Sequence, residues 1–303
     1  MTDDTARFSS AVGSVGVTAE LRETWQNDGL IVLPRLVTEE QVTRHLALVA
    51  AVRAEVPNGR DEYGLGDRIG QLHQKLPELI DTVASERLLA FLKYALEDEP
   101  LVFASLNFER GTQQEVHVDL IYFCTEPLHA MVGVWIALED ISIDAGPLFY
   151  HLGSHHWPFE YQSDVHSDGV DVSRPAAGAE LGSRAKAWLE RLASRVAERG
   201  SPKKPMVLRK GDAVVWHARL AHGGMPRVAP ELSRKSVVYH FIGKGSKLFT
   251  YEEFFTYPKD ELLRRNGLSV PTKTRGIVEY QSHPYFVTYD GGKELVHPIQ
   301  TTE

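Results

Sequence analysis

Glu-Val-His-Val-Asp-Leu, residues 115–120, is the stretch from which the rest of this sequence is interpreted. Side chains alternate along an extended strand, so His117 and Asp119 would point to the same side of it. A third ligand from elsewhere would complete two histidines and one carboxylate, the facial arrangement of non-haem Fe(II) sites that activate oxygen. Alone the tripeptide is a weak signal, because 13 histidines and 41 acidic residues produce such spacings by chance.

Short apolar segments separated by turn residues follow one another through the middle of the chain. Such a series is typical of a β-sandwich or barrel. Apolar residues at helical spacing precede it, so we expect a mainly β fold with flanking helices. The expected helices cover 18–29, 38–52 and 76–96, and the expected strands cover 30–33, 101–108, 115–123, 130–138, 147–151, 206–208, 213–216 and 236–242.

The sequence shows no linker that would mark a second domain, so we expect one domain over residues 1–303 with its core at about 18–243. Residues 157–204 form a long insertion whose second half, 183–199, has the spacing of an amphipathic helix. Insertions of this size serve as lids or interaction surfaces, which makes this one a candidate lid. The extension 244–303 is rich in aromatic residues, and we expect it to pack against the main body.

The composition restricts the kinds of partner. A net charge of −8 disfavours nucleic acid and anionic membranes, because both attract basic surfaces. No stretch approaches the ~20 apolar residues that cross a bilayer, and the first residues are acidic where a secretory signal would be positively charged. The single cysteine, Cys124, rules out an intrachain disulfide and is typical of a reducing compartment. We therefore expect a cytoplasmic monomer or homodimer that acts on a small molecule.

The third metal ligand is expected within residues 210–224, where a glycine turn and an apolar strand precede two histidines, His217 and His222. Twelve residues beyond His222 stands Arg234, followed two positions later by Ser236. On a strand this pair would present a guanidinium and a hydroxyl on one face, which together can bind a carboxylate through charge-assisted hydrogen bonds. The residues alone leave both histidines open as the third ligand. A metal triad beside a carboxylate clamp is what an iron enzyme that uses a 2-oxo dicarboxylate needs.

These segments, in this order, resemble the phytanoyl-CoA dioxygenase family of Fe(II)/2-oxoglutarate-dependent oxygenases. The resemblance covers roughly residues 18–243 and implies a double-stranded β-helix, a cupin-like jelly roll whose mouth holds the iron. It also implies Fe(II) as cofactor, with 2-oxoglutarate and O2 as cosubstrates. The usual Pro-Gly-Ser-His of the family appears here as 152–155, Leu-Gly-Ser-His. The matching segments are 26–33, 117–123, 135–140, 146–155, 211–224 and 234–236.

Carried over residue by residue, the resemblance assigns roles to seven side chains. The iron ligands would be His117, Asp119 and His222, and the residues near 2-oxoglutarate would be Arg234, Ser236, Trp135 and Arg68. No arginine clamp stands at the family's distance from His217, which is therefore expected at a strand end or behind a ligand and not on the metal. Related halogenases replace the aspartate by a small residue, so an intact Asp119 favours oxygenation over halogenation.

The predicted activity is oxidation of an unactivated C–H bond in a small metabolite or natural-product intermediate, with release of succinate and CO2. The sequence does not choose between hydroxylation, desaturation, cyclisation and epimerisation. Two alternatives stay open: a jelly-roll protein that binds a metal or ligand without turnover, and a cupin-like metalloenzyme that does not use 2-oxoglutarate. A rival metal cluster at His151, His155 and His156 is disfavoured, because Gly153 and Pro158 predict a turn there.

Overall fold

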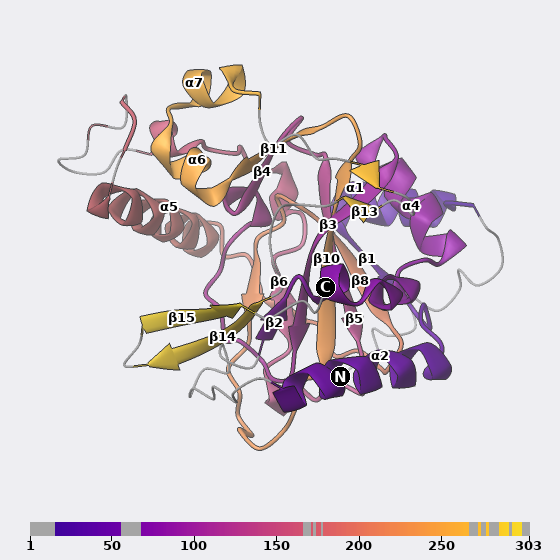
Figure 1. Ribbon diagram of the computed structural model, residues 1–303. Helices are drawn as coiled ribbons and strands as arrows, with labels where there is room; N and C mark the ends of the chain where they lie inside the picture. Colours follow the sequence, from indigo (N-terminus) through magenta and orange to yellow (C-terminus); the bar gives the residue numbers. More distant parts are fainter. Residues whose placement is uncertain are drawn as a thin grey trace.

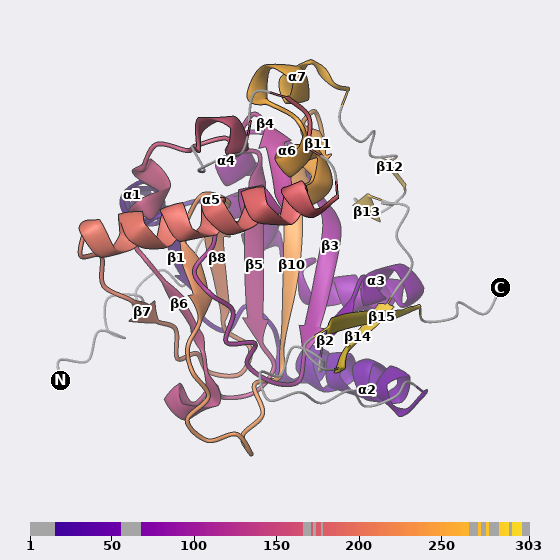
Figure 2. The ribbon, with the colours of Figure 1, turned by 90° about the vertical axis from the view of Figure 1, so that its left-hand side faces the viewer.

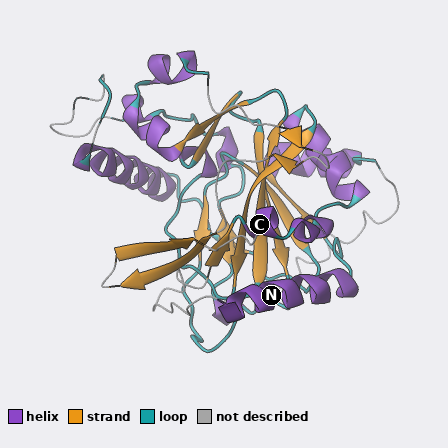
Figure 3. Ribbon diagram, viewed as in Figure 1, coloured by secondary structure: helices purple, strands orange, loops and turns teal. Residues whose placement is uncertain are grey.

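A large, mostly antiparallel sheet runs through the molecule, with helices on both sides of it (Figures 1 and 3). The structure is a computed structural model that describes residues 16–55, 68–165, 171, 174–176 and 178–266, together with the backbone of four short strands near the C-terminus. The large sheet runs in the order β1 (Leu30–Leu33), β8 (Ala213–His217), β5 (Met131–Ala137), β10 (Ser236–Gly243), β3 (Pro100–Phe108), β2 (Arg68–Gly70), β14 (Tyr285–Asp290) and β15 (Lys293–Pro298), while β13 (Ile277–Val278) adds to β3 and pairs with β12 (Thr272–Lys273).

Two smaller sheets complete the strand arrangement. One has the order β7 (Lys204–Pro205), β6 (Leu148–Tyr150) and β9 (His222–Gly224), and the other pairs β11 (Lys247–Thr250) with β4 (Phe123–Glu126). Side chains of β6 pack with the inner face of the large sheet, where Trp135, Trp216 and Val238 are buried. Strands of two sheets that enclose a common interior are the arrangement of a jelly roll, as predicted.

The opposite, outer face of the large sheet packs against helices. Helices α1 (Ala19–Asp28), α2 (Glu39–Glu55) and α4 (Glu86–Leu96) contribute apolar side chains to this layer. The alternation along β8 is clear: Ala213 and Val215 face the helices, whereas Val214 and Trp216 face the interior. Helix α5 (Ala179–Glu198) lies on the other side of the large sheet from α1 and α4 (Figures 1 and 2).

The start of the domain follows the sequence expectation closely. The Thr18 hydroxyl accepts a hydrogen bond from the Leu21 amide at 3.2 Å and caps α1. Gly29 ends the helix in the left-handed region at φ +70°. A Cβ at Gly29 would also lie only 2.4 Å from Nδ1 of His155, so the close approach of these two segments requires glycine.

Helix α5 and the extension also match their predictions where they are described. The insertion helix buries Trp188 and Leu192, and the α6 helix (Tyr251–Thr256) buries Phe254 and Phe255 in the same apolar cluster. A second short helix, α7 (Lys259–Arg264), follows. The side chains of residues 267–303, and residues 166–170, 172–173 and 177 of the insertion, lie outside the described part of the chain.

Three predicted elements were wrong. The helix predicted at 76–96 is broken into a 3-10 helix, Pro77–Thr82, and α4, because the Thr82 hydroxyl bonds back to the Leu79 carbonyl and the chain turns before α4. No strand forms at the predicted 206–208: the chain pairs with β6 only at β7, just before it, and residues 206–208 keep single backbone bonds, from the Met206 amide to the Leu148 carbonyl and from the Ile141 amide to the Leu208 carbonyl. The strand predicted at 115–123 is also absent, and its replacement shapes the metal centre.

None of the described helices combines the length and apolar character that a bilayer crossing requires.

Candidate metal centre

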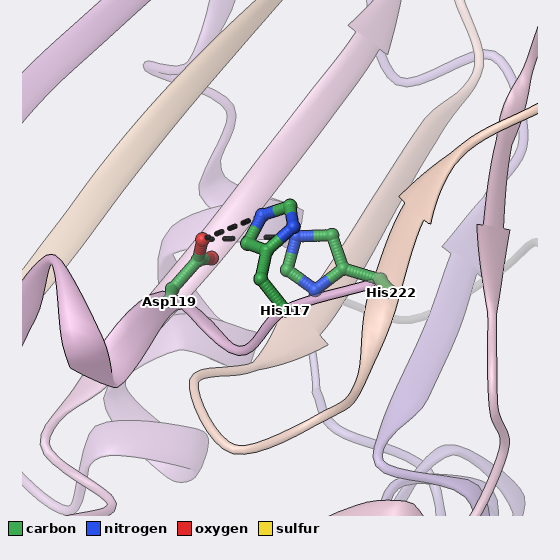
Figure 4. Close-up of side chains that lie close together, drawn as sticks. All are labelled: His117, Asp119 and His222. Carbon is green, nitrogen blue, oxygen red and sulfur yellow. Dashed lines mark ion pairs between the residues drawn. The ribbon is translucent and has the colours of Figure 1, made fainter. Parts of the chain in front are cut away.

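Two histidines and one aspartate converge in the interior between the sheets (Figure 4). Nε2 of His117 lies 3.9 Å from Oδ1 of Asp119, and Nε2 of His222 lies 3.6 Å from the same oxygen. The centroids of the two imidazole rings are 4.3 Å apart, and all three side chains are buried. Among the described residues, this is the one group of histidine, cysteine and acidic side chains with the spacing of a metal site.

A single antiparallel bridge brings the two histidines together. The His117 amide donates to the His222 carbonyl at 2.8 Å, and the His222 amide donates to the His117 carbonyl at 2.9 Å. After Val118, which is extended, a 3-10 helix over Asp119–Ile121 turns the chain. The sequence argument for a regular strand was therefore wrong, but the turn still directs Asp119 towards the imidazoles of His117 and His222.

Hydrogen bonds on the far side of each imidazole favour metal binding. Nδ1 of His117 lies 2.8 Å from the Glu115 carbonyl, and Nδ1 of His222 lies 2.8 Å from the Leu220 carbonyl. A carbonyl can only accept, so each Nδ1 carries a proton, and the neutral form of each ring has its lone pair on Nε2, towards the shared point. Burial, and secondarily His222, lowers the pKa of His117 to about 4, so this ring is neutral at neutral pH. The residues therefore fit a divalent metal with two imidazole ligands.

The aspartate is oriented by two side chains that sequence reasoning missed. Oδ2 of Asp119 accepts a hydrogen bond from the Trp216 indole at 2.8 Å and lies 3.6 Å from Nε2 of His240. Burial acts to raise the pKa of Asp119, but the imidazoles of His222, His240 and His117 together hold it well below its usual range. The carboxylate is thus ionised, with one oxygen anchored and the other free to bind a cation.

A sequence signal for both missed residues existed. Trp216 precedes His217 on β8, so if His217 faces outward the tryptophan must face inward. His240 lies four positions after Ser236 on β10, on the same face of the strand. Strand alternation alone would have placed both side chains towards the centre.

We expect Trp216→Phe to weaken metal binding by about 10- to 100-fold, because the substitution removes the indole donor that orients Asp119. Anaerobic titration with Fe(II) measures the affinity directly. Trp188→Phe is the matched control: it removes an indole N–H that donates to the Glu160 carbonyl at 2.8 Å in the insertion, and it should leave the affinity for Fe(II) unchanged. Equal losses in both variants would contradict the role given to Trp216.

The competing histidines lie elsewhere. The His217 ring packs 5.8 Å from Trp25 of α1 and 5.3 Å from His155, and burial lowers its pKa to about 3. His217 is therefore a neutral residue at a strand end, as preferred from the sequence. His155 and His156 both place Nε2 near the Gln26 carbonyl, at 3.2 and 2.7 Å, in a 3-10 turn that packs on α1.

Arg234 is a buried cation without a carboxylate partner in the described residues. Its guanidinium lies 5.5 Å from the Phe108 ring and 5.6 Å from the Trp135 ring, and Nη1 donates to the Gly146 carbonyl at 3.2 Å. Nε has no hydrogen-bond partner in the described structure, and burial lowers the pKa of Arg234 to about 10. A buried charge in this state is costly unless an anion binds to it, so the surroundings of Arg234 suit a ligand carboxylate.

The remaining predicted residues occupy different positions. The Ser236 hydroxyl donates to the Arg234 carbonyl at 3.2 Å. Trp135 is fully buried, and its indole N–H has no partner among the described residues. Arg68, on β2, pairs with Phe108 of β3 in the antiparallel register. Its contact with 2-oxoglutarate stays a prediction from the sequence.

The relatives found by sequence comparison carry the name of one protein family. The rat protein named phytanoyl-CoA dioxygenase domain-containing protein 1 (Rattus norvegicus) is 24% identical over 181 residues, which cover 58% of this chain and 57% of that protein. The peroxisomal phytanoyl-CoA dioxygenase of Mus musculus is 23% identical over 262 residues, which cover 78% of this chain and 71% of that protein. The bovine and mouse forms of the first protein are matched over 46% and 32% of their length, so the chain spans about half or less of these three curated relatives.

Solved structures show the same fold. The carbocyclase SnoK from nogalamycin biosynthesis, a non-haem α-ketoglutarate-dependent enzyme, superposes with a TM-score of 0.59 at 19% identity, covering 86% of this chain and 94% of its own. EctD from S. alaskensis, solved with 2-oxoglutarate and 5-hydroxyectoine, superposes with a TM-score of 0.59 at 16% identity, covering 86% and 89%. The family model described as phytanoyl-CoA dioxygenase (PhyH) matches residues 25–236. The chain therefore belongs to the phytanoyl-CoA dioxygenase family.

Proposed function

We propose that this protein is an Fe(II)/2-oxoglutarate-dependent oxygenase that oxidises a C–H bond of a small molecule and releases succinate and CO2. The convergence of two imidazoles and one ionised carboxylate on a buried point carries the proposal. Two histidines and one carboxylate on one side of an ion leave positions for a chelating 2-oxo acid and for oxygen. The buried cation of Arg234 adds a second feature that suits a dicarboxylate.

Each part of the site has a separate task in this proposal. His117, Asp119 and His222 would hold Fe(II), and Arg234 would bind the far carboxylate of 2-oxoglutarate. Bound Fe(II) and 2-oxoglutarate would supply the activation of O2. Trp216 donates to one oxygen of Asp119, so the other oxygen would be available to Fe(II).

The insertion supports the proposal as a cover for the metal-bearing segments. Trp188 and Leu192 of α5 line a cavity of about 20 Å³ together with Val118 and Ala221, which neighbour the metal ligands in sequence. We propose that the described part of the insertion shields this side from water, which would protect the reaction from side products. We also propose that the chain forms a single domain, because side chains of the insertion and of the C-terminal extension share one apolar cluster with the main body.

For the substrate we propose a small metabolite or a natural-product intermediate. SnoN, another structure of the same fold, is an epimerase of nogalamycin biosynthesis, whereas SnoK is a carbocyclase and EctD was solved with a hydroxylated compound. Because proteins of this fold differ in the reaction they catalyse, we keep hydroxylation, cyclisation and epimerisation as candidate reactions for this protein. The intact Asp119 speaks against halogenation. A cytoplasmic location and a monomeric or homodimeric state stay predictions from the sequence.

Anaerobic addition of Fe(II) and 2-oxoglutarate is expected to give a visible charge-transfer absorption that requires both compounds. Admission of oxygen should then convert 2-oxoglutarate to succinate, faster when a suitable candidate substrate is present. Zn(II) in place of Fe(II) is the control and should give neither the absorption nor succinate. Fe(II) binding without any response to 2-oxoglutarate would contradict the proposal and favour a metalloprotein that does not use this acid.

A further inference from the structure

Tyr150 lies beside the candidate metal centre without being part of it. The residue stands opposite His222 in the antiparallel pairing of β6 with β9. Its ring stacks on the His222 imidazole, with centroids 5.5 Å apart and an interplanar angle of 24°, and lies 5.8 Å from the Trp216 ring. The side chain is fully buried, so strand register fixes it within the interior of the jelly roll.

The Tyr150 hydroxyl has no hydrogen-bond partner in the described residues. Another fully buried tyrosine, Tyr239 on the outer face of the sheet, shows the usual situation: its hydroxyl lies 2.6 Å from the Leu79 carbonyl and 3.2 Å from the Thr82 hydroxyl. An unsatisfied buried hydroxyl destabilises a fold unless a ligand or water completes it. The contrast indicates that the Tyr150 hydroxyl serves something other than packing.

The electrostatic surroundings indicate what would complete it. Tyr150 lies within electrostatic range of both the Asp119 carboxylate and the Arg234 guanidinium. A phenol is ordinarily protonated at neutral pH, so the hydroxyl can donate a hydrogen bond. Nε of Arg234 and the indole N–H of Trp135 also lack acceptors among the described residues, and Trp135 shares an apolar cluster with Tyr150.

Three buried donors without acceptors in one interior call for a ligand rich in acceptor oxygens. We infer that Tyr150 binds the far carboxylate of 2-oxoglutarate through its hydroxyl, together with Arg234. The inference rests on the proposed function, because it assigns a further binding residue to the same cosubstrate. Nothing in the position of the ring requires the hydroxyl for packing, since phenylalanine would fill the same volume.

The test compares two 2-oxo acids on the Fe(II)-loaded protein under anaerobic conditions. 2-Oxoglutarate has the far carboxylate, whereas 2-oxobutyrate has the same chelating end and lacks it. We expect Tyr150→Phe to weaken 2-oxoglutarate binding about 10- to 100-fold, the usual effect of losing a hydrogen bond to a charged group. Binding of 2-oxobutyrate and of Fe(II) alone should stay unchanged.

Tyr239→Phe is the matched control, since it also removes one buried phenol hydroxyl. Its affinity for 2-oxoglutarate should equal that of the unsubstituted protein, while its melting temperature should fall because a satisfied hydrogen bond is lost. Tyr150→Phe without ligands should melt at the same temperature or higher. Unchanged 2-oxoglutarate affinity in Tyr150→Phe, or equal weakening of both acids, would overturn the inference. Failure of the unsubstituted protein to bind 2-oxoglutarate would instead overturn the proposed function itself.

Discussion

His222→Ala is expected to lower the affinity for Fe(II) on the order of 100-fold or more, since it removes one of three ligands, and to abolish succinate formation. The effect should exceed that of Trp216→Phe, because Trp216 only orients a ligand. Anaerobic Fe(II) titration followed by the charge-transfer absorption with 2-oxoglutarate measures both consequences. The backbone bridge to His117 does not depend on the imidazole, so the fold should be retained.

His217→Ala provides the matched control for this loss. The two histidines lie five positions apart on neighbouring segments, and both are buried. His217 packs against Trp25 and His155, so its removal should lower stability and leave Fe(II) affinity unchanged. Loss of Fe(II) binding in His217→Ala with retention in His222→Ala would reverse the ligand assignment.

Arg234→Met is expected to weaken 2-oxoglutarate binding about 100-fold while leaving Fe(II) affinity unchanged, because a buried charge-assisted carboxylate contact is lost. In the absence of ligand, the same substitution should leave the free energy of unfolding unchanged or raise it. The reason is that Arg234 is a buried cation with no carboxylate partner in the described structure, and methionine fills similar volume without the desolvation cost. Isothermal titration and chemical denaturation measure the two effects separately.

Arg184→Met tests whether the stability result is specific. Arg184 is as buried as Arg234, but its guanidinium donates to the carbonyls of Asp171 and Arg174 at 2.7 and 2.9 Å and to Oε1 of Gln162 at 3.2 Å. Its removal leaves these acceptors unsatisfied and should cost about 1–3 kcal/mol of stability. The two buried arginines should therefore respond with different signs; a large loss of stability in ligand-free Arg234→Met would show that Arg234 has a structural partner.

The sequence predicted those parts of the fold that depend on local periodicity. Helix α1 with its Thr18 cap, and the strands β1, β8 and β10, arise from apolar spacing and turn residues within a few positions. The prediction of an interior strand at 115–123 was wrong, because this segment forms only an isolated bridge, between His117 and His222, and then turns in a 3-10 helix at Asp119. Apolar alternation cannot distinguish such a turn from a strand.

The candidate site shows the same division between local and distant information. His117, Asp119, His222 and Arg234 could be named from motif order, and the first three lie together. The contacts of Trp216 with Asp119, and of Tyr150 with His222, depend on how sheets distant in sequence pack together. Alternation along β8 indicates that Trp216 faces the interior, but no spacing within one strand specifies which side chain of another segment it meets.

The reciprocal backbone bridge between His117 and His222 has a consequence for how the protein acquires its metal. The two histidines are held side by side by main-chain hydrogen bonds, so the ion meets ligands that are already ordered. Little chain entropy is lost on binding, and the metal need not drive folding as it does in small zinc domains. The empty and loaded proteins would therefore share one architecture, and an ion lost to a chelator could be replaced by simple readdition, without refolding.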